Sequence, residues 1–329
     1  MNLPQVIDAS TKPKGCCAPS SAHDSCECDT AKQSISTQED QTEMLARMVK
    51  LPGGDFLMGT DSKESFPADG EGPVRQVTLR PFFIDRTTVT NRTFRKFIEA
   101  TGYRTDAERF GWSFVFWLHI PKERFREMVK ERVVAVPWWC KVEGARWDAP
   151  EGPGSDLCGR EDHPVVHVSW NDAVAFTQWS GQRLPTEAEW EFAARGGLEQ
   201  KIYPWGDRLR PNGEHRCNIW QGDFPNHDTA EDGYSGTCSV EAFPPNGYDL
   251  YSMTGNTWEW CADWFSADFH RTASRDNPTG PPTGTARVMK GGSFLCHKSY
   301  CNRYRVAARS SNTPDSSTSH MSFRCALSA

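Results

Sequence analysis

The chain has 329 residues, enough to build a substantial core in one large domain or two. Its formal charge of −6 argues against broad nucleic-acid binding through a basic surface. It contains no apolar stretch near the ~20 residues of a membrane span. Its first residues lack both a basic start and an apolar signal core. We therefore expect a cytoplasmic protein that binds neither nucleic acid nor a membrane.

The N-terminal part differs in composition from the rest. Residues 1–44 are polar and lack hydrophobic periodicity, so we expect a disordered tail before a single domain over residues 45–329. The tail contains four cysteines, at Cys16, Cys17, Cys26 and Cys28. Such closely spaced thiols suit a soft metal, although incidental thiols in a disordered segment are the plainer interpretation.

From Met48 onward the pattern is typical of a globular domain. Residues 56–59 and 74–79 are predicted to form short strands between Asp/Gly/Pro loops. Thr90 is predicted to cap a helix that ends before Gly102 and buries one apolar face.

Two further helices are predicted from capping boxes. Ser169-Trp170-Asn171-Asp172 opens the first, which runs to about Ser180. Thr186-Glu187-Ala188-Glu189 opens the second, which runs to about Arg195. After Gly196 the chain is predicted to form loops and short strands. The 13 tryptophans, 26 glycines and 22 prolines also disfavour a helical bundle. We expect an α+β fold with few long elements.

The most informative segment holds Cys296 and Cys301. Residues five apart point away from each other on a helix or a strand, so the two sulfurs meet only where the chain is irregular. Gly291-Gly292 permits a sharp entry into such a loop.

Three interpretations of this pair are open: buried inert thiols, a disulfide, or a working pair. Lys298, His297 and nearby arginines argue against an inert apolar setting. A reducing compartment and a short loop disfavour a structural disulfide. A working pair is favoured, and both bound Cu(I) and a redox dithiol suit it.

Two oxygen-rich loops and a set of arginines have plainer explanations from composition alone. The first loop set is Asn218-Ile219 with Asp232 and Tyr234, and the second is Gly255, Thr257 and Glu259. Hard cations favour such oxygens, but no EF-hand spacing is present, so ordinary turns are the better interpretation.

From composition alone, Trp258 is interpreted as a core residue. Three arginines read as members of ion pairs: Arg303, Arg305 and Arg309.

Several longer motifs resemble the formylglycine-generating enzymes, also called sulfatase-modifying factors, over about residues 48–326. They include His-Pro-Val-Val-His-Val-Ser-Trp-Asn-Asp-Ala from His163, Arg-Leu-Pro-Thr-Glu-Ala-Glu-Trp-Glu from Arg183, and Met-Thr-Gly-Asn-Thr-Trp-Glu-Trp from Met253. Cys-His-Lys-Ser-Tyr-Cys from Cys296, followed by Arg-Tyr-Arg, is the most specific motif.

The resemblance implies a C-type-lectin-like fold with little regular secondary structure. It also implies an oxidase that uses O2 and Cu(I) to convert the cysteine of a Cys-x-Pro-x-Arg motif, in an unfolded or nascent sulfatase, to Cα-formylglycine. We expect a monomer. Alternatives are a non-catalytic relative that binds sulfatases, a lectin-like domain with structural cysteines, and a sulfoxide synthase. The last needs an iron-binding helical domain that the tail cannot supply.

Residue roles follow from the same resemblance. Cys296 and Cys301 would bind copper, and Ser293 and Trp258 would line the oxygen and substrate pocket. Residues implied near the substrate are His297, Tyr300 and Arg309.

The resemblance also implies calcium at the two loop sets. Asn218, Asp232 and the main chain of Ile219 and Tyr234 would bind one ion. Gly255, Thr257 and Glu259 would contribute to a second, although Ser252 stands where an asparagine ligand is usual.

Other positions depart from the pattern of animal members. Thr177, Ala194 and Val306 stand at three of the four half-cystine positions of those members, and Cys325 stands at the fourth. The animal disulfides therefore cannot form here, which indicates a prokaryotic-type enzyme. His320 replaces an asparagine near the substrate groove. One further hypothesis is that the cysteine-containing tail helps to recruit copper.

Overall fold

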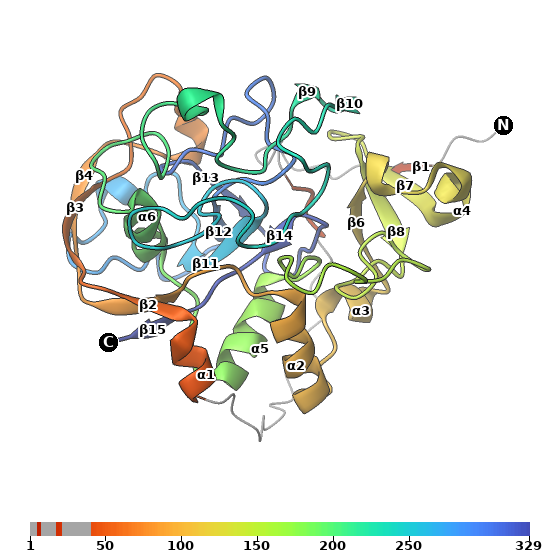
Figure 1. Ribbon diagram of the computed structural model, residues 1–329, viewed down its shortest axis with the longest axis horizontal. Helices are drawn as coiled ribbons and strands as arrows, with labels where there is room; N and C mark the ends of the chain where they lie inside the picture. The colour runs from red at the N-terminus through yellow and green to blue at the C-terminus, as the bar shows by residue number, and fades with distance from the viewer. Residues whose placement is uncertain (1–4, 8–17, 22–40) are drawn as a thin grey trace.

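The computed structural model describes residues 5–7, 18–21 and 41–329. Figure 1 shows short strands and loops around a few helices, in agreement with the predicted α+β class. The α-helices are α1 (Gln41–Ala46), α2 (Asn91–Thr101), α3 (Asp106–Phe110), α4 (Phe125–Met128), α5 (Trp170–Ser180) and α6 (Glu187–Arg195). The 3-10 turns are η1 (Pro67–Asp69), η2 (Trp117–His119), η3 (Lys122–Arg124), η4 (Pro211–Gly213) and η5 (Phe269–Arg271). No helix among these described residues is long and apolar enough to cross a bilayer.

The predicted helices form because their caps are present. Thr90 accepts the Thr93 N–H at the start of α2, and Gly102 ends that helix with φ 64°. Capping boxes open α5 at Ser169 and α6 at Thr186. These three helix predictions are confirmed.

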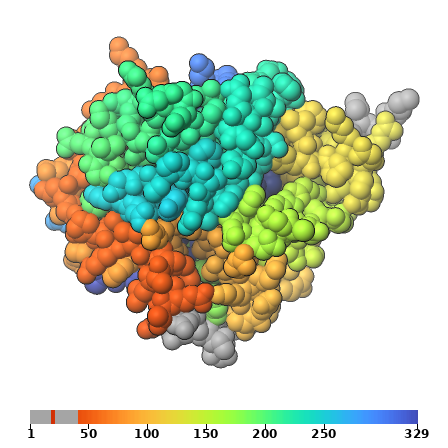
Figure 2. All heavy atoms as spheres, in the orientation of Figure 1, coloured from red at the N-terminus to blue at the C-terminus, as the bar shows by residue number. Residues whose placement is uncertain are grey.

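Two sheets carry most of the strands. The central sheet has the order β13 (Arg309–Asn312), β12 (Arg287–Lys290), β11 (Trp258–Trp264) and β14 (Met321–Ser322). The second has the order β1 (Gln5–Ile7), β7 (Val129–Val133), β8 (Trp139–Glu143) and β6 (Trp112–Phe116). The second sheet belongs to the yellow lobe beside the main body in Figures 1 and 2.

The remaining strands form smaller sheets. They are β15 (Ala326–Ser328), β5 (Phe82–Asp85) and β2 (Met48–Leu51); β3 (Gly54–Met58) with β4 (Arg75–Leu79); and β9 (Gly222–Asp223) with β10 (His227–Asp228). The predicted strands at 56–59 and 74–79 correspond to β3 and β4. Because β15 and β2 flank β5, the two ends of the domain meet in one sheet.

The largest core cluster lies between α2, α5 and the central sheet. The rings of Phe94, Phe97 and Phe176 pack there at 5.4–6.0 Å between centroids. This buried cluster also contains Trp258, Cys296 and Cys301. The thiol pair is therefore set in the main core and not on the rim of the fold.

The predicted tail over residues 1–44 falls largely outside the described residues, as do its four cysteines. The described pieces contact the domain. Gln5–Ile7 pairs in parallel with β7, and Ala18–Ser21 packs against the segment after β13. Helix α1 already begins at Gln41, before the predicted domain start at residue 45.

Candidate active site and cation sites

Cys296 and Cys301 face each other within the core. Their Sγ atoms are 3.1 Å apart, and each residue is 1% exposed. A disulfide requires about 2.05 Å between the sulfurs, so the two cysteines are not disulfide-bonded. As predicted, the chain between them is irregular. Two facing thiols at this distance can share one soft ion or form a disulfide on oxidation.

The sharp entry at Gly291-Gly292 is confirmed. Their φ angles are 94° and 73°, in the region that favours glycine. A Cβ at Gly292 would lie 3.0 Å from the Arg303 carbonyl oxygen, so the close approach of these two segments also needs a glycine. The chain then turns at Ser293, whose carbonyl accepts the Cys296 N–H at 2.9 Å.

A second turn returns the chain to the first thiol. The His297 carbonyl accepts the N–H groups of Tyr300 at 3.0 Å, Cys301 at 2.8 Å and Asn302 at 3.2 Å. We call residues 291–302 the cysteine loop. Its two turns bring together sulfurs that the linear sequence separates by five positions.

A buried ion pair holds the start of the cysteine loop. Lys290, the residue before it, is fully buried and donates to Glu191 at 3.1 Å. Arg195 also donates to Glu191, at 2.6 Å. Burial opposes ionisation of Glu191, but Lys290 and Arg195 outweigh it and lower its pKa to about 2. The carboxylate is therefore ionised at neutral pH and anchors the end of β12.

Two buried ion pairs hold the other end of the loop. Arg303 donates to Asp69 at 2.6 Å and to the Cys301 carbonyl at 3.4 Å. Arg305 makes a two-pronged pair with Glu71, at 2.6 and 2.8 Å. We call Lys290–Glu191, Arg303–Asp69 and Arg305–Glu71 the flanking ion pairs. They fix the loop from both sides.

Ser293 and Trp258, which the resemblance implies in the oxygen and substrate pocket, both lie in the core. The Ser293 N–H donates to Cys296 Sγ at 3.3 Å, and its hydroxyl accepts the Leu295 N–H at 3.3 Å. Ser293 and Trp258 are both fully buried. Trp258 begins β11 in the same cluster as the thiols, and its indole N–H has no hydrogen-bond partner among the described residues. That N–H is a donor available to a bound molecule.

His297 and Tyr300 lie on the outer side of the cysteine loop. The Tyr300 ring stacks on Phe224 with 4.5 Å between centroids and meets Trp138 edge-on at 4.9 Å. His297 Nδ1 lies 2.7 Å from the Ser299 hydroxyl. Partial burial and Lys298 lower the pKa of His297, so the ring is neutral at pH 7. The two side chains present an aromatic, uncharged face beside the thiols.

Arg309 belongs to a buried ionic network. Its guanidinium pairs with Glu187 at 2.7 Å. It also donates to the Ser266 carbonyl at 3.0 Å, and it lies over the Phe265 ring. This geometry agrees with the ion-pair interpretation of the three arginines, and the placement of Arg309 near the substrate stays a prediction.

The scattered cysteines differ from the pair. The scattered cysteines are Cys140, Cys158, Cys217, Cys238, Cys261 and Cys325. All are buried except Cys158, which is exposed. Burial raises the pKa of Cys140 to about 11 and that of Cys238 to about 12, so both stay protonated thiols at neutral pH. No disulfide joins any cysteine in the described part of the chain.

The first predicted calcium set is brought together. Asn218 Oδ1 is buried and has no hydrogen-bond partner in the described structure. The Ile219 carbonyl and one Asp232 oxygen both accept a hydrogen bond from the Gln221 side-chain nitrogen. These two oxygens therefore converge on one position, as the oxygen ligands of a cation do. Asp232 also accepts the Tyr234 N–H at 3.0 Å. This donor set fits a hard cation. No sequence motif pointed to Gln221.

The second calcium set fits less well. Arg324 donates to both oxygens of Glu259, at 2.6 and 2.8 Å, and Trp190 donates to one of them at 2.8 Å. The carboxylate is already neutralised, so it offers little negative charge to a metal. Thr257 Oγ1 is buried without a partner in the described residues, and Gly255 approaches the Asn218 carbonyl too closely for any side chain.

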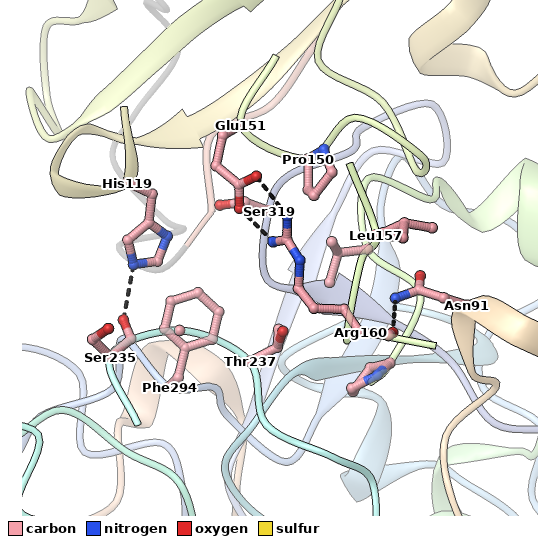
Figure 3. Close-up of a pocket in the computed structure, with 13 residues that line it drawn as sticks. Asn91, His119, Pro150, Glu151, Leu157, Arg160, Ser235, Thr237, Phe294 and Ser319 are labelled. Carbon is pink, nitrogen blue, oxygen red and sulfur yellow. Dashed lines mark hydrogen bonds and ion pairs between the residues drawn. The ribbon is translucent and has the colours of Figure 1, made fainter. Parts of the chain in front are cut away.

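A cavity of about 370 Å³ lies behind Phe294 (Figure 3). The wall opposite carries the Arg160–Glu151 ion pair at 2.6 and 2.9 Å. His119 closes one side and lies 2.8 Å from the Ser235 carbonyl through Nε2. Neither thiol lines this cavity. Of the cysteine loop, Phe294 lines this cavity, while the thiols lie inside the core cluster.

The family model described as "Sulfatase-modifying factor enzyme 1-like domain" matches residues 32–329. The chain belongs to this family. It is 64% identical over 288 residues to a protein of Thermomonospora curvata named formylglycine-generating enzyme, covering 86% of this chain and 94% of that relative.

Two further matches set limits on what family membership implies. A Bos taurus protein named inactive C-alpha-formylglycine-generating enzyme 2 is 49% identical over 285 residues, covering 86% of this chain and 88% of that protein. The solved structure of PvdO from Pseudomonas aeruginosa matches with a TM-score of 0.62 and 25% identity, covering 86% of this chain and 94% of that one. The fold prediction is confirmed. Because a related protein is named inactive, activity has to be argued from the site.

Proposed function

We propose that this protein oxidises the cysteine of a Cys-x-Pro-x-Arg motif in an unfolded or nascent sulfatase to Cα-formylglycine. The overall chemistry consumes the substrate thiol, O2 and two equivalents of an external thiol. It yields the aldehyde, hydrogen sulfide, water and one disulfide of the external thiol. Relatives named formylglycine-generating enzyme support this activity.

One observation carries the proposal: two thiols that are not disulfide-bonded face each other at 3.1 Å in a loop fixed by buried ion pairs. Thiolates are soft ligands, and Cu(I) is a soft ion that accepts few of them. Bound copper would supply the centre at which the substrate sulfur and O2 react. The Cys296 and Cys301 side chains would hold that ion, and the core around them would exclude bulk water.

Other residues would position the substrate. Ser293 contacts Cys296 through its main-chain N–H, and Trp258 belongs to the same buried cluster as the thiols. The Ser293 hydroxyl and the unpartnered Trp258 N–H would orient a small oxygen species or the peptide cysteine. Tyr300 and His297 offer an uncharged surface to an incoming peptide. We further propose that Ca²⁺ binds the set around Asn218 and Asp232. The protein would act as a monomer in the cytoplasm.

Mass spectrometry of a Cys-x-Pro-x-Arg peptide tests the activity. The peptide is incubated with the protein, Cu(I), a thiol reductant and O2. The expected result is conversion of the peptide cysteine to an aldehyde that depends on copper and is absent with Cys301→Ser. No conversion by copper-loaded protein would overturn the proposal and would favour a non-catalytic role, as for a relative that is named inactive.

A further inference from the structure

Asn256 lies between the Asn218–Asp232 set and the cysteine loop, and it is only 2% exposed. Its main-chain N–H donates to the Asn218 carbonyl at 2.8 Å, and its carbonyl accepts the Phe294 N–H at 3.0 Å. Asn218 is a proposed cation ligand, and Phe294 belongs to the cysteine loop. One residue therefore joins the two sites through its main chain.

The residue before Asn256 makes a parallel connection. The Gly255 N–H donates to the carbonyl of Gly291, the first residue of the cysteine loop, at 2.9 Å. A Cβ at Gly255 would lie 2.5 Å from the Asn218 carbonyl oxygen, so only a glycine permits this close approach. Residues 255–256 therefore lie against Asn218 on one side and against the cysteine loop on the other.

The Asn256 side chain holds this arrangement together. Its Oδ1 accepts hydrogen bonds from the Cys238 N–H at 3.0 Å and from Asn218 Nδ2 at 3.3 Å. Its Nδ2 donates to the Cys238 carbonyl at 3.1 Å. The φ angle of Asn256 is 60°, in the left-handed region that asparagine adopts more readily than most residues. These bonds fix the conformation in which the main chain of Asn256 reaches both sites.

A second connection begins at the residue that follows the proposed ligands. Ile219, whose carbonyl is a proposed ligand, precedes Trp220, and the Trp220 N–H donates to the Cys296 carbonyl at 3.2 Å. Trp220 and Cys296 are each 1% exposed. A shift of residues 218–220 would therefore act directly on the backbone of one of the two thiol residues.

We propose that Asn256 is a positioning residue that couples cation binding at the Asn218–Asp232 set to the geometry of the two thiols. Asn218 Oδ1 has no hydrogen-bond partner among the described residues, so a bound cation would give it one and would fix this segment. Fixing the segment would hold Phe294 and Cys296 in place and would preorganise the thiols for Cu(I). The inference rests on the proposed function for the identity of both metals.

Coupling of this kind acts in both directions. Coupling between two binding sites typically changes each affinity by about 5–150-fold, and the factor is the same for both ligands. We expect saturating Ca²⁺ to lower Kd for Cu(I) about tenfold, and Cu(I) to lower Kd for Ca²⁺ by the same factor. Because contiguous hydrogen bonds carry the effect, a variant that loosens them should bind both ions independently.

Asn256→Gly tests this role without adding backbone strain, because glycine readily adopts a φ of 60°. It removes the side-chain bonds to Cys238 and Asn218. Competition with a chromophoric Cu(I) chelator gives Kd for Cu(I) in the full chain, first depleted of Ca²⁺ and then with Ca²⁺ added. The ratio of these two Kd values should be about ten in the native protein and about one in Asn256→Gly.

Asn277→Gly is the matched control, because Asn277 also has a positive φ, of 42°, and its side chain accepts the Arg80 N–H at 2.8 Å. This variant should keep the native ratio. A purely structural role of Asn256 would lower the unfolding midpoint, or raise both Kd values equally, and would leave the ratio unchanged. An unchanged ratio in Asn256→Gly, or a ratio of about one in the native protein, would overturn the inference.

A copper-free measurement and the peptide assay separate this inference from the proposed function. Alkylation of Cys296 and Cys301 by iodoacetamide, followed by mass spectrometry, should be slowed by Ca²⁺ in the native protein but not in Asn256→Gly. Equal rates with and without Ca²⁺ in the native protein would contradict the coupling. The expected ratio without any peptide conversion would overturn only the oxidase, and normal conversion without Ca²⁺ dependence would overturn only the coupling. Absence of Cu(I) binding would overturn both.

Discussion

The cysteine loop and its flanking ion pairs show opposite uses of buried polar chemistry. In the flanking ion pairs, each charged group lies at about hydrogen-bond distance from an opposite charge. These charges are neutralised by their partners and fix the backbone at both ends of the loop. In the cysteine loop, two thiols face each other at 3.1 Å in the core, and the Trp258 indole N–H of the same cluster is buried without a hydrogen-bond partner among the described residues. The comparison teaches that rigid, neutralised ends hold two soft groups in a fixed geometry.

The largest expected effect comes from the thiols themselves. Cys296→Ser and Cys301→Ser should each lower the rate of peptide oxidation by at least about 10³, because a hydroxyl is not a soft ligand. The unfolding midpoint should change little, since serine is nearly isosteric. Rates by mass spectrometry and unfolding by circular dichroism check both parts. The exposed Cys158→Ser is the control, and equal losses in it would remove the distinction between the pair and the other cysteines.

The second prediction breaks a flanking ion pair. Glu71→Gln leaves the Arg305 guanidinium buried without its counter-charge, and we expect a loss of about 3–5 kcal/mol in the free energy of unfolding. Urea titration measures this loss. Glu127→Gln disrupts an exposed pair with Arg124 and should leave the midpoint unchanged. Similar midpoints for the two variants would show that the flanking pair does not hold the fold.

The third prediction concerns acid. The folded-state pKa of Glu191 is about 2, below its usual value, so the unfolded state binds more protons between the two values. The stability from this group is present above about pH 4.5 and is lost as pH falls toward 2, by about 3 kcal/mol in total. Urea midpoints at a series of pH values should show this loss. In Glu191→Gln, which is less stable throughout, that component should vanish, and an unchanged pH dependence would contradict it.

The smallest expected effect concerns calcium. If the Asn218–Asp232 set binds Ca²⁺, a concentration of 100 Kd raises the free energy of unfolding by about 2.7 kcal/mol. Chelation should lower the thermal midpoint of the native protein but not of Asp232→Asn. Asp223→Asn, at an exposed position in the same region, should respond like the native protein. A calcium response retained in Asp232→Asn would move the site elsewhere.

Local signals explain what could be predicted. Helices α2, α5 and α6 were predicted because Thr90, Ser169 and Thr186 cap them within four residues of sequence. The irregular path between the two cysteines followed from their spacing and from the glycines before them. These features depend on neighbours along the chain, which a sequence displays directly.

Long-range contacts explain what could not. The ion-pair partner of Arg309 is Glu187, which lies 122 positions away in sequence. Gln221 and the unpaired Asn218 Oδ1 become a possible cation site only when separate loops meet. No local sequence pattern indicates these pairings, because they depend on how the sheets bring distant loops together.

A copper titration with a rate readout tests the central claim most directly. Copper-free protein receives Cu(I) in steps, and the initial rate of aldehyde formation on the peptide is measured at each step. We predict a rate that rises linearly and stops rising at one equivalent of copper, with no rise in Cys301→Ser. A full rate in the presence of a strong Cu(I) chelator, or an equal response in Cys301→Ser, would contradict the assignment of Cys296 and Cys301 as the copper-binding pair.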